Sequence, residues 1–208
     1  YSANEYLTRI NLMKSHETGY GTPILKGKSV AVVGGGNVAM DAVRCAKRMG
    51  AEHVYLIYRR SEEEMPARLE GRHHAKEEGI EFKTLTNPVR IIGDEAGQVT
   101  QIECVEMALG EADASGRRTP AVKEGANFTM DVEIVIMAIG TSPNPLIPKT
   151  IKSLETNRHG CIVTDDTMKT SVNNIYAGGD AVKGAATVIY AMGTGKVAAS
   201  SIHKSMFN

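Results

Sequence analysis

The 208-residue sequence predicts an α/β fold in which a parallel sheet carries helices and is followed by an antiparallel β-meander. A β-favouring run, Val30–Val33, leads directly into Gly34–Gly36, and a helical pattern follows at once. A second apolar strand, His53–Tyr58, ends within about 30 residues of the first, as a βαβ unit requires. After Pro88 the pattern changes to short, weakly alternating strands joined by glycine-containing turns.

The glycine turn after the first strand has the composition of a phosphate-binding element. Gly34, Gly36 and Ala39 fit the pattern G-x-G-x-x-A between a strand and a helix. Glycines let the backbone turn sharply and approach a phosphate, toward which the unpaired N–H groups of the helix point. We therefore predict a Rossmann-like dinucleotide-binding turn, and an ordinary βαβ turn without a ligand is the alternative. The helix is expected to end at Gly50 and to bury Val38, Ala42, Val43 and Ala46.

The end of the second strand indicates which dinucleotide is bound. A site for NAD or FAD usually places Asp or Glu there, about 20 residues beyond the glycines, to bind the ribose 2′-hydroxyl. This strand ends instead in Arg59 and Arg60. Two guanidinium groups suit a 2′-phosphate, so we expect NADP(H). The alternative is a solvated arginine pair that Glu62, Glu63 and Glu64 offset.

Composition excludes several classes of function. Lys plus Arg equal Asp plus Glu at 24 each, so charge gives no reason to expect nucleic acid or anionic membrane as a partner. The three cysteines, Cys45, Cys104 and Cys161, contain no C-x-x-C pair, which excludes a redox dithiol motif and an iron–sulfur ligand run in this chain. Adjacent His73 and His74 point about 100° apart on a helix and are read as surface residues, so no metal site is expected.

The cysteine content and the absence of a signal peptide or long apolar run favour a soluble, cytoplasmic protein. A helix is expected over about Ala3–Lys14, with Ser2 and Glu5 as a capping box. A linker with glycines and a proline is expected to follow over His16–Lys28, and a charged helix within Glu62–Glu78.

A third strand, Ile80–Leu85, is expected to precede the meander. The meander strands are predicted over Pro88–Gly93, Val99–Leu109 and Phe128–Met130. Gly110–Gly125 is polar and contains glycines, and it is expected to form a mobile hairpin tip. The apolar run Val132–Ile139 should then return as a buried strand and bring Gly140 beside the first glycine turn, where backbone can close over a dinucleotide.

The last third of the chain predicts short strands over Cys161–Val163 and Ile175–Ala177, the second leading to Gly179 and Asp180. Asp180 also suits an ordinary turn or the start of a helix.

A nearly all-apolar helix over about Ala186–His203 is expected to be buried on most sides. It contains a second G-x-G-x-x-A at Gly193–Ala198, but the chain ends too soon for a second strand to follow. Gly193 and Gly195 are therefore expected to permit close helix packing.

Four motifs together identify a family resemblance. They are Gly34–Asp41 (GGGNVAMD), Tyr58–Ala67 (YRRSEEEMPA), Ala138–Asn144 (AIGTSPN) and Asn174–Val188 (NIYAGGDAVKGAATV). Over nearly its whole length the chain resembles the small-subunit family of NADPH-dependent glutamate synthase. The wider family also resembles the flavin subunits of ferredoxin:NADP oxidoreductases and the electron-input half of dihydropyrimidine dehydrogenase. In such proteins an NADPH domain is inserted into an FAD domain, and an iron–sulfur module precedes both.

The resemblance implies roles for individual residues. It assigns the NADPH pyrophosphate to Gly34, Gly35, Gly36, Asn37 and Val38, and the 2′-phosphate to Arg59 and Arg60. It assigns the FAD ribityl and phosphate region to Gly179 and Asp180, and the flavin pyrimidine edge to Ala186, Thr187 and Val188. The last three are expected at a helix N-terminus, whose positive end stabilises negative charge on a reduced flavin.

The implied domains are an N-terminal helix and linker on the flavin side (1–26), an NADP(H)-binding domain (27–141) and the C-terminal part of an FAD-binding domain (142–208). The family's first FAD motif and its iron–sulfur cysteines are absent from the sequence, and Tyr1 is not a methionine. We therefore expect a piece of a longer protein that binds NADP(H), holds half of a flavin site, carries little or no FAD and is inactive alone. Iron–sulfur clusters are expected only in the missing N-terminal region.

The implied function is electron input for glutamate synthesis, with a large catalytic subunit as partner. Hydride passes from C4 of the nicotinamide to N5 of the flavin, and the electrons continue to iron–sulfur clusters. The cofactors supply this chemistry and the protein orients them, so no catalytic residue is expected. A non-catalytic NADPH sensor is the alternative from another class. A thioredoxin-reductase-like disulfide enzyme would need a C-x-x-C pair, which this sequence lacks.

Overall fold

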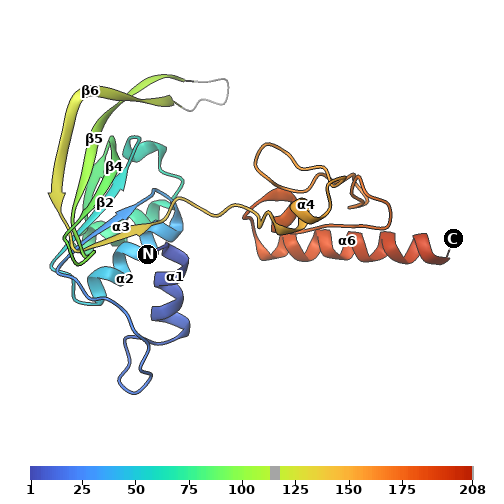
Figure 1. Cartoon of the computed structure of the whole chain (residues 1–208), viewed down its shortest axis with the longest axis horizontal. Helices are drawn as coiled ribbons and strands as arrows, with labels where there is room; N and C mark the ends of the chain where they lie inside the picture. The colour runs from blue at the N-terminus through green and yellow to red at the C-terminus, as the bar shows by residue number, and fades with distance from the viewer. Residues whose placement is uncertain (113–117, 208) are drawn as a thin grey trace. The chain divides into compact units, whose positions relative to one another are not determined.

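The computed structural model describes residues 1–112 and 118–207, in two compact units, Tyr1–Ile139 and the chain from Gly140 onward (Figure 1). The division falls at the end of the Val132–Ile139 segment. The assignment of a cofactor to each of the two units stays a prediction.

The first unit is built on a four-stranded parallel sheet in the order β3-β2-β1-β7. Its strands are β1 (Ser29–Val33), β2 (His53–Tyr58), β3 (Glu81–Thr84) and β7 (Ile134–Met137). At the carboxyl edge of the central pair, Val33 is in register with Ile57 of β2 and with Met137 of β7. The parallel sheet and all four of its strands confirm the sequence-based prediction. The strands are rich in β-branched residues because both faces of the sheet are covered.

Helices cover one face of this sheet. They are α1 (Ala3–Leu7), which continues as a π-helical turn (Thr8–Leu12), α2 (Asn37–Arg48) and α3 (Leu69–Glu77). Alternate strand residues such as Val30 and Val32 join Tyr6 of α1 and Val43 of α2 in one core. The N-terminal helix therefore packs into the first unit.

Two predicted helix starts differ in detail. Ser2 caps α1 by accepting the Glu5 N–H at 3.2 Å, but the Glu5 carboxylate pairs with Arg9 at 3.0 Å and does not close the capping box. The charged segment after β2 forms a 3₁₀ turn (Glu62–Glu64) before α3 begins at Leu69. The interruption follows from Pro66, because a residue before proline is disfavoured in helical conformation, and Met65 is extended at φ −66°, ψ 126°.

The antiparallel meander covers the other face of the sheet. It consists of β4 (Thr86–Gly93), β5 (Val99–Ala112) and β6 (Arg118–Asp131), in that order. Ile102 and Cys104 of β5 pack with Ala31, Val33 and other inward residues of the parallel sheet. This arrangement confirms the predicted change of period after Pro88.

The hairpin tip predicted over Gly110–Gly125 is too long, because strands occupy most of this segment. β5 and β6 extend into it as a two-stranded ribbon that continues beyond the end of β4 (Figure 1). Cross-strand pairs such as Met107 with Val122 hold the ribbon, and Lys123 contacts Glu106 at 3.0 Å. Beyond Met107 the described residues of the ribbon are half-buried or exposed, so its sequence lacks the apolar alternation that would predict strands. The rest of the connection, residues 113–117, lies outside the described residues.

The second unit contains α4 (Leu146–Thr150), α5 (Asp180–Lys183) and α6 (Val188–Phe207). The two strands predicted here are only isolated bridges, such as Thr156 with Ile162 and Lys169 with Tyr176. The helix α4 was not predicted.

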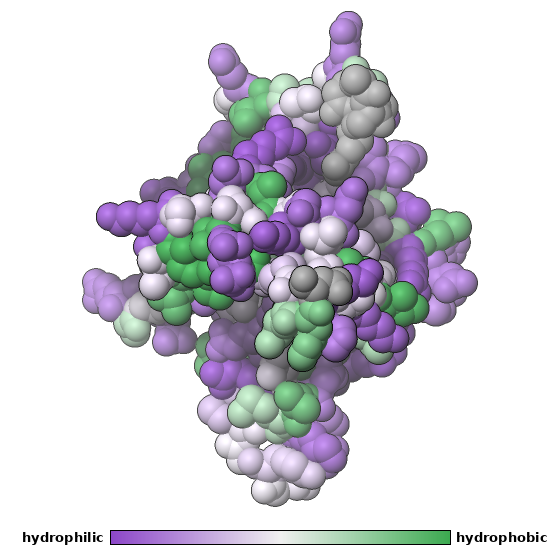
Figure 2. All heavy atoms as spheres, turned by 90° about the vertical axis from the view of Figure 1, so that its right-hand side faces the viewer, coloured by the Kyte–Doolittle hydropathy of each residue, from purple (hydrophilic) through white to green (hydrophobic). Residues whose placement is uncertain are grey.

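The expectation that α6 is buried on most sides is wrong for this chain. Thr194 is its one buried residue, whereas apolar side chains such as Ile189, 84% exposed, face outward. Apolar patches among charged side chains are visible on the face shown in Figure 2. Gly193 and Gly195 have no atom within 4 Å of a Cβ position, so they do not serve close packing. An apolar pattern indicates that a helix face can be buried, but it does not show which part of a protein covers that face.

Within the described residues, every helix is too short or too polar to span a bilayer.

A candidate dinucleotide site in the first unit

The three glycines after β1 have three different surroundings. Gly34 has φ +148°, and a Cβ there would collide with the carbonyl oxygen of Ala138. A Cβ on Gly35 would lie 2.5 Å from the ring of Tyr58. At Gly36 no atom lies within 4 Å of the Cβ position. The first two glycines are therefore required by the fold, whereas the third leaves open space.

The open space at Gly36 lies at the N-terminus of α2. Gly36 is the N-cap residue, and among the described residues the N–H groups of Gly36, Asn37 and Val38 donate to no acceptor. Exposed N–H groups at a helix N-terminus, next to a glycine without steric neighbours, are the features that a pyrophosphate needs. The residues present therefore fit the predicted group.

The start of α2 differs from the prediction at one position. Ala42, Val43 and Ala46 are buried as expected, but Val38, in the first turn of the helix, is 43% exposed. Ala39, the third position of the motif, is fully buried. A small residue is needed there for close packing of helix on strand.

Hydrogen bonds join the segment after β2 to the glycine turn and to the start of α2. The Ala67 N–H donates to the carbonyl oxygen of Gly35 at 3.0 Å, and the Arg68 N–H donates to Oδ1 of Asn37 at 2.9 Å. The Asn37 side chain therefore binds protein backbone, while its own N–H stays available.

Arg59 and Arg60 lie at the carboxyl end of β2, as predicted. Arg59 is exposed, and Arg60 is half-buried and donates from Nε to the carbonyl oxygen of Arg118 at 2.9 Å. Two of the carboxylates that could offset them are engaged elsewhere. Glu62 pairs with Lys76 at 2.6 Å, and Glu64 contacts Arg118 at 3.4 Å.

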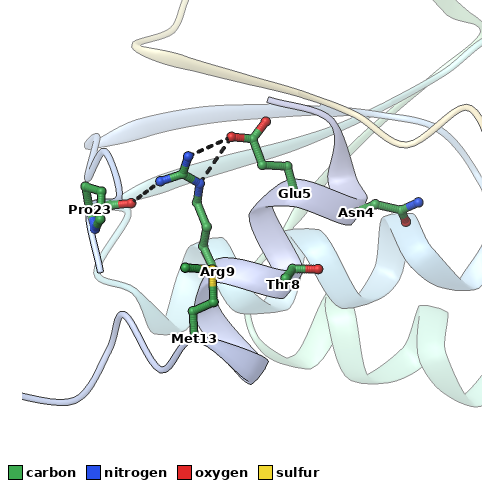
Figure 3. Close-up of a pocket in the computed structure, with 6 residues that line it drawn as sticks. All are labelled: Asn4, Glu5, Thr8, Arg9, Met13 and Pro23. Carbon is green, nitrogen blue, oxygen red and sulfur yellow. Dashed lines mark hydrogen bonds and ion pairs between the residues drawn. The ribbon is translucent and has the colours of Figure 1, made fainter. Parts of the chain in front are cut away.

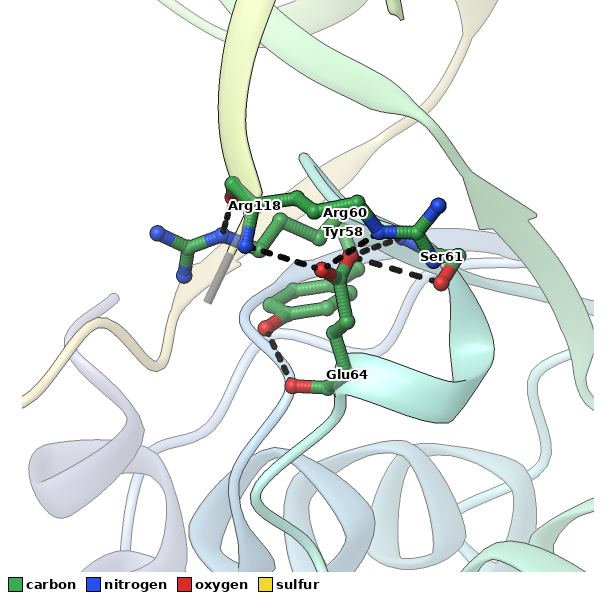
Figure 4. Close-up of polar contacts among 5 residues, drawn as sticks. All are labelled: Tyr58, Arg60, Ser61, Glu64 and Arg118. Carbon is green, nitrogen blue, oxygen red and sulfur yellow. Dashed lines mark hydrogen bonds and ion pairs between the residues drawn. The ribbon is translucent and has the colours of Figure 1, made fainter. Parts of the chain in front are cut away.

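Glu64 is the centre of a polar cluster that the sequence did not predict (Figure 4). Its carboxylate accepts from the Ser61 N–H and from the Arg118 N–H, both at 3.3 Å, while the Tyr58 hydroxyl donates to its carbonyl oxygen at 3.0 Å. Desolvation acts to raise the pKa of the Glu64 carboxyl, but the hydrogen bonds from Ser61 and Arg118 outweigh it and lower the pKa. The carboxylate therefore stays ionised at neutral pH.

The remaining predicted site residues belong to the second unit. Gly140 is the first residue of this unit and has φ +91°. Its position over a bound dinucleotide stays a prediction. Gly179 has φ +65° and donates its N–H to the buried Oγ1 of Thr194 at 2.8 Å. Asp180 begins α5 and is exposed, as its plainer interpretation also expected.

Asp180 lines a hollow of about 290 Å³. The other lining residues include Asn144 from the start of the unit, Ile147 of α4, Ile162, and Gly184 directly after α5. The segment Ala186–Val188 lies at the N-terminus of α6, as predicted, and the Thr187 hydroxyl accepts the Tyr190 N–H at 3.3 Å.

A second hollow, of about 510 Å³, lies beside α1 and contains none of the predicted site residues. Arg9 crosses it, contacting the Glu5 carboxylate and donating to the carbonyl oxygen of Pro23 at 2.6 Å (Figure 3).

The structure shows the state of the cysteines and the exposure of the adjacent histidines. Cys45, Cys104 and Cys161 are free thiols, and burial raises the pKa of Cys104 to about 11. His73 and His74 are exposed on α3. Within residues 1–112 and 118–207, no group of three or more His, Cys, Asp or Glu residues could hold a metal ion.

A parallel βαβ sheet with a three-glycine turn, helices on one face and a β-meander on the other defines a Rossmann-like dinucleotide-binding fold. The chain belongs to the pyridine nucleotide-disulphide oxidoreductase family, whose pattern matches residues 3–195.

Relatives of this chain include oxidoreductase subunits. The chain is 45% identical over 181 residues to the NADP(+)-dependent formate dehydrogenase subunit beta of Moorella thermoacetica, covering 86% of this chain and 25% of that protein. It is 40% identical over 209 residues to the glutamate synthase [NADPH] small chain of Azospirillum brasilense, covering 97% of this chain and 43% of that protein. The resemblance stated from the motifs is thereby confirmed. The chain spans less than half the length of these two relatives.

Solved structures share the fold. T. acidophilum thioredoxin reductase has a TM-score of 0.69 at 23% identity, covering 88% of this chain and 54% of that one. Mycobacterium tuberculosis FprA in complex with NADPH has a TM-score of 0.72 at 16% identity, covering 100% of this chain and 58% of that one. At these identities the likeness concerns the fold alone.

Proposed function

We propose that this chain is the NADPH-binding electron-input module of a glutamate-synthase-like flavoprotein oxidoreductase. The proposal assigns NADPH to residues 27–141 and the C-terminal part of an FAD domain to residues 142–208. The relative from Azospirillum brasilense, matched over 97% of this chain, supports it, because that protein is a glutamate synthase [NADPH] small chain.

The observation that carries the proposal is the pairing of an open Gly36 with two arginines at the end of the next strand. Among the described residues, no atom lies within 4 Å of the Cβ position of Gly36, and the neighbouring N–H groups have no acceptor. A pyrophosphate there would continue toward the adenosine, whose 2′-phosphate would meet Arg59 and Arg60. Neither arginine is neutralised by Glu62 or Glu64, which contact other cations.

The protein's part in the reaction is binding and orientation. NADPH, when bound, supplies a hydride for the flavin, and the transfer needs no acid or base from the protein. Gly34, Gly36 and the N–H groups of Asn37 and Val38 would fix the pyrophosphate. Gly179 and Asp180 would form half of the flavin site, and Ala186–Val188 would direct the positive end of α6 at the flavin.

A titration with both coenzymes tests the proposal. The chain should bind NADPH more tightly than NADH, and the double variant Arg59→Ala, Arg60→Ala should lose NADPH affinity far more than NADH affinity. Arg90→Ala is a matched control, since Arg90 is an exposed arginine of the same unit that contacts Glu103 at 3.1 Å. Equal losses for the two coenzymes would contradict the assignment.

A second measurement concerns the flavin. We propose that the 208-residue chain carries little or no FAD and is inactive alone, because it provides only part of the flavin site. The visible spectrum of the purified chain should therefore lack flavin bands, and one flavin per chain would contradict this.

The same module could serve another acceptor. The relative from Moorella thermoacetica, at 45% identity, is a formate dehydrogenase subunit, and another relative is the NADPH-Fe(3+) oxidoreductase subunit beta of Geobacter sulfurreducens. Modules of ferredoxin:NADP oxidoreductases and dihydropyrimidine dehydrogenase are comparable candidates. Reduction of an artificial acceptor by NADPH in the full-length protein would separate all of these from a non-catalytic NADPH sensor.

The partner is proposed on the same grounds. The relatives' names describe subunits of larger enzymes, so we propose a large catalytic subunit as the partner of the full-length protein.

A further inference from the structure

Arg118, at the start of β6, touches the loop that follows β2 although 54 residues separate it from Glu64 (Figure 4). Its carbonyl oxygen accepts from Nε of Arg60 at 2.9 Å, while its N–H donates to Oε1 of Glu64 at 3.3 Å. The main chain of Arg118 is thereby fixed against the segment that carries the two arginines of the proposed coenzyme site.

The Arg118 side chain is oriented by the same carboxylate. Its Nε lies 3.4 Å from Oε1 of Glu64, and the Glu64 carboxylate also accepts from the N–H and hydroxyl of Ser61 at 3.3 and 3.4 Å. The Glu64 side chain is 16% exposed, whereas that of Arg118 is 47% exposed. A mostly covered anion therefore holds a guanidinium whose outer end remains open to solvent.

The two guanidinium groups lie on opposite sides of the Glu64 carboxylate (Figure 4). That of Arg60 is held through Nε, as is that of Arg118. Within the described residues the terminal Nη nitrogens of both arginines have no acceptor, so each of these nitrogens can still donate two hydrogen bonds. Arg59, which directly precedes Arg60, is exposed.

We propose that Arg118 is a third cationic ligand of the coenzyme 2′-phosphate, positioned in advance by Glu64. This inference rests on the proposed NADPH function. A phosphate dianion has three acceptor oxygens, and a planar guanidinium donates to two of them at once. Because Glu64 engages Nε, the terminal nitrogens of Arg118 can bind phosphate without breaking that contact. The β-meander then contributes to the preference for NADPH over NADH.

The test compares Arg118→Ala with the unchanged 208-residue chain. The variant keeps the main-chain contacts to Arg60 and Glu64 and removes the side chain beyond Cβ, including the guanidinium. Its dissociation constant for NADPH should rise about tenfold, equivalent to about 1.4 kcal/mol, while that for NADH changes less than about twofold. Adenosine 2′,5′-bisphosphate and 5′-AMP should reproduce this contrast, because they differ in the 2′-phosphate. Arg118→Lys should recover part of the lost NADPH affinity, since it keeps the charge.

Lys123→Ala is the matched control. Lys123 lies on the same strand, has a side chain that is 52% exposed and contacts a carboxylate, Glu106, at 3.0 Å. This variant should leave the affinities for both coenzymes unchanged. Thermal unfolding should show that both variants remain folded.

The outcomes separate this inference from the proposed function. If the Arg59→Ala, Arg60→Ala variant loses NADPH selectively and Arg118→Ala behaves as the Lys123 control, Arg118 is not a ligand and the NADPH assignment stands. Equal weakening of NADPH and NADH by Arg118→Ala also overturns the inference, because it indicates a general effect of the ribbon. If no arginine variant is selective, the NADPH assignment itself fails.

Discussion

The carbonyl oxygen of Ala138 occupies the space that a Cβ on Gly34 would need. The Ala138 N–H donates to the carbonyl oxygen of Val33 at 2.7 Å, so the end of β7 is joined to β1 immediately before the glycine turn. The path of the turn is therefore fixed by the neighbouring strand. Gly34 is needed for the fold, and Gly36, two residues later, is not.

Gly34→Ala should destabilise the protein. The residue has φ +148°, where an L side chain is strained, and the new methyl group would overlap the Ala138 carbonyl. Strain and overpacking together should lower the free energy of unfolding by about 3 kcal/mol. Urea denaturation measures this, and a loss below about 1 kcal/mol would show that β7 can move away from the turn at little energetic cost.

Gly36→Val should have the opposite pattern. No atom lies within 4 Å of the Cβ position, so the fold accommodates the side chain with a change of about 1 kcal/mol or less at the helix N-cap. The added carbons would fill the space proposed for the pyrophosphate. Calorimetric titration should show more than about tenfold weaker binding of NADPH and NADH alike. A folded variant with normal affinity would exclude this turn as the pyrophosphate site.

The first βαβ unit could be predicted from sequence because each of its signals is local. Buried strands read as apolar runs, and the glycine turn is followed by a helix that ends at Arg48, shortly before Gly50. The contact between Arg118 and Glu64 could not be predicted, because it depends on a solvent-exposed ribbon whose pairing leaves no apolar period in the sequence. Tyr58 was assigned to a strand, but its role beneath Gly35 emerges only from the packing.

The errors in the second unit have a different cause. The apolar composition of α6 indicates a helix that can be buried, yet the contact it makes in this chain is narrow and centres on Thr194. Close packing occurs at Gly178, whose Cβ would lie 3.1 Å from Oγ1 of Thr194, and not at Gly193 or Gly195. The hydropathy of a sequence does not show whether the glycines at such a contact lie on the helix or on the segment that packs against it.

Glu78 should make stability depend on acid pH. It joins the end of α3 to α2, accepting from Arg48 at 2.7 Å and from Arg44 at 2.8 Å, and these hydrogen bonds lower its pKa. A carboxyl whose folded pKa is lowered stabilises the fold above its unfolded pKa of about 4.3 and loses that effect as pH falls through the folded pKa. Glu78→Gln should therefore cost about 1 kcal/mol at neutral pH and nothing in strong acid.

Denaturation at a series of pH values tests this. Glu52→Gln is a matched control, since Glu52 contacts exposed Lys28 at 3.3 Å and should contribute little at any pH. A deficit of Glu78→Gln that persists unchanged in strong acid would indicate altered packing instead of a lost ion pair.

Thr194→Val should loosen the second unit at the turn proposed to hold flavin. The Thr194 hydroxyl accepts the Gly179 N–H at 2.8 Å and can donate to the carbonyl oxygen of Tyr190 at 3.0 Å. Valine keeps the shape but leaves a buried N–H unpaired, which should cost about 1 to 3 kcal/mol. Hydrogen exchange at the Gly179 amide should accelerate accordingly. Thr194→Ser keeps the hydroxyl and should largely retain protection, so equal acceleration in both variants would show that the hydrogen bond to the Thr194 hydroxyl is not what protects this amide.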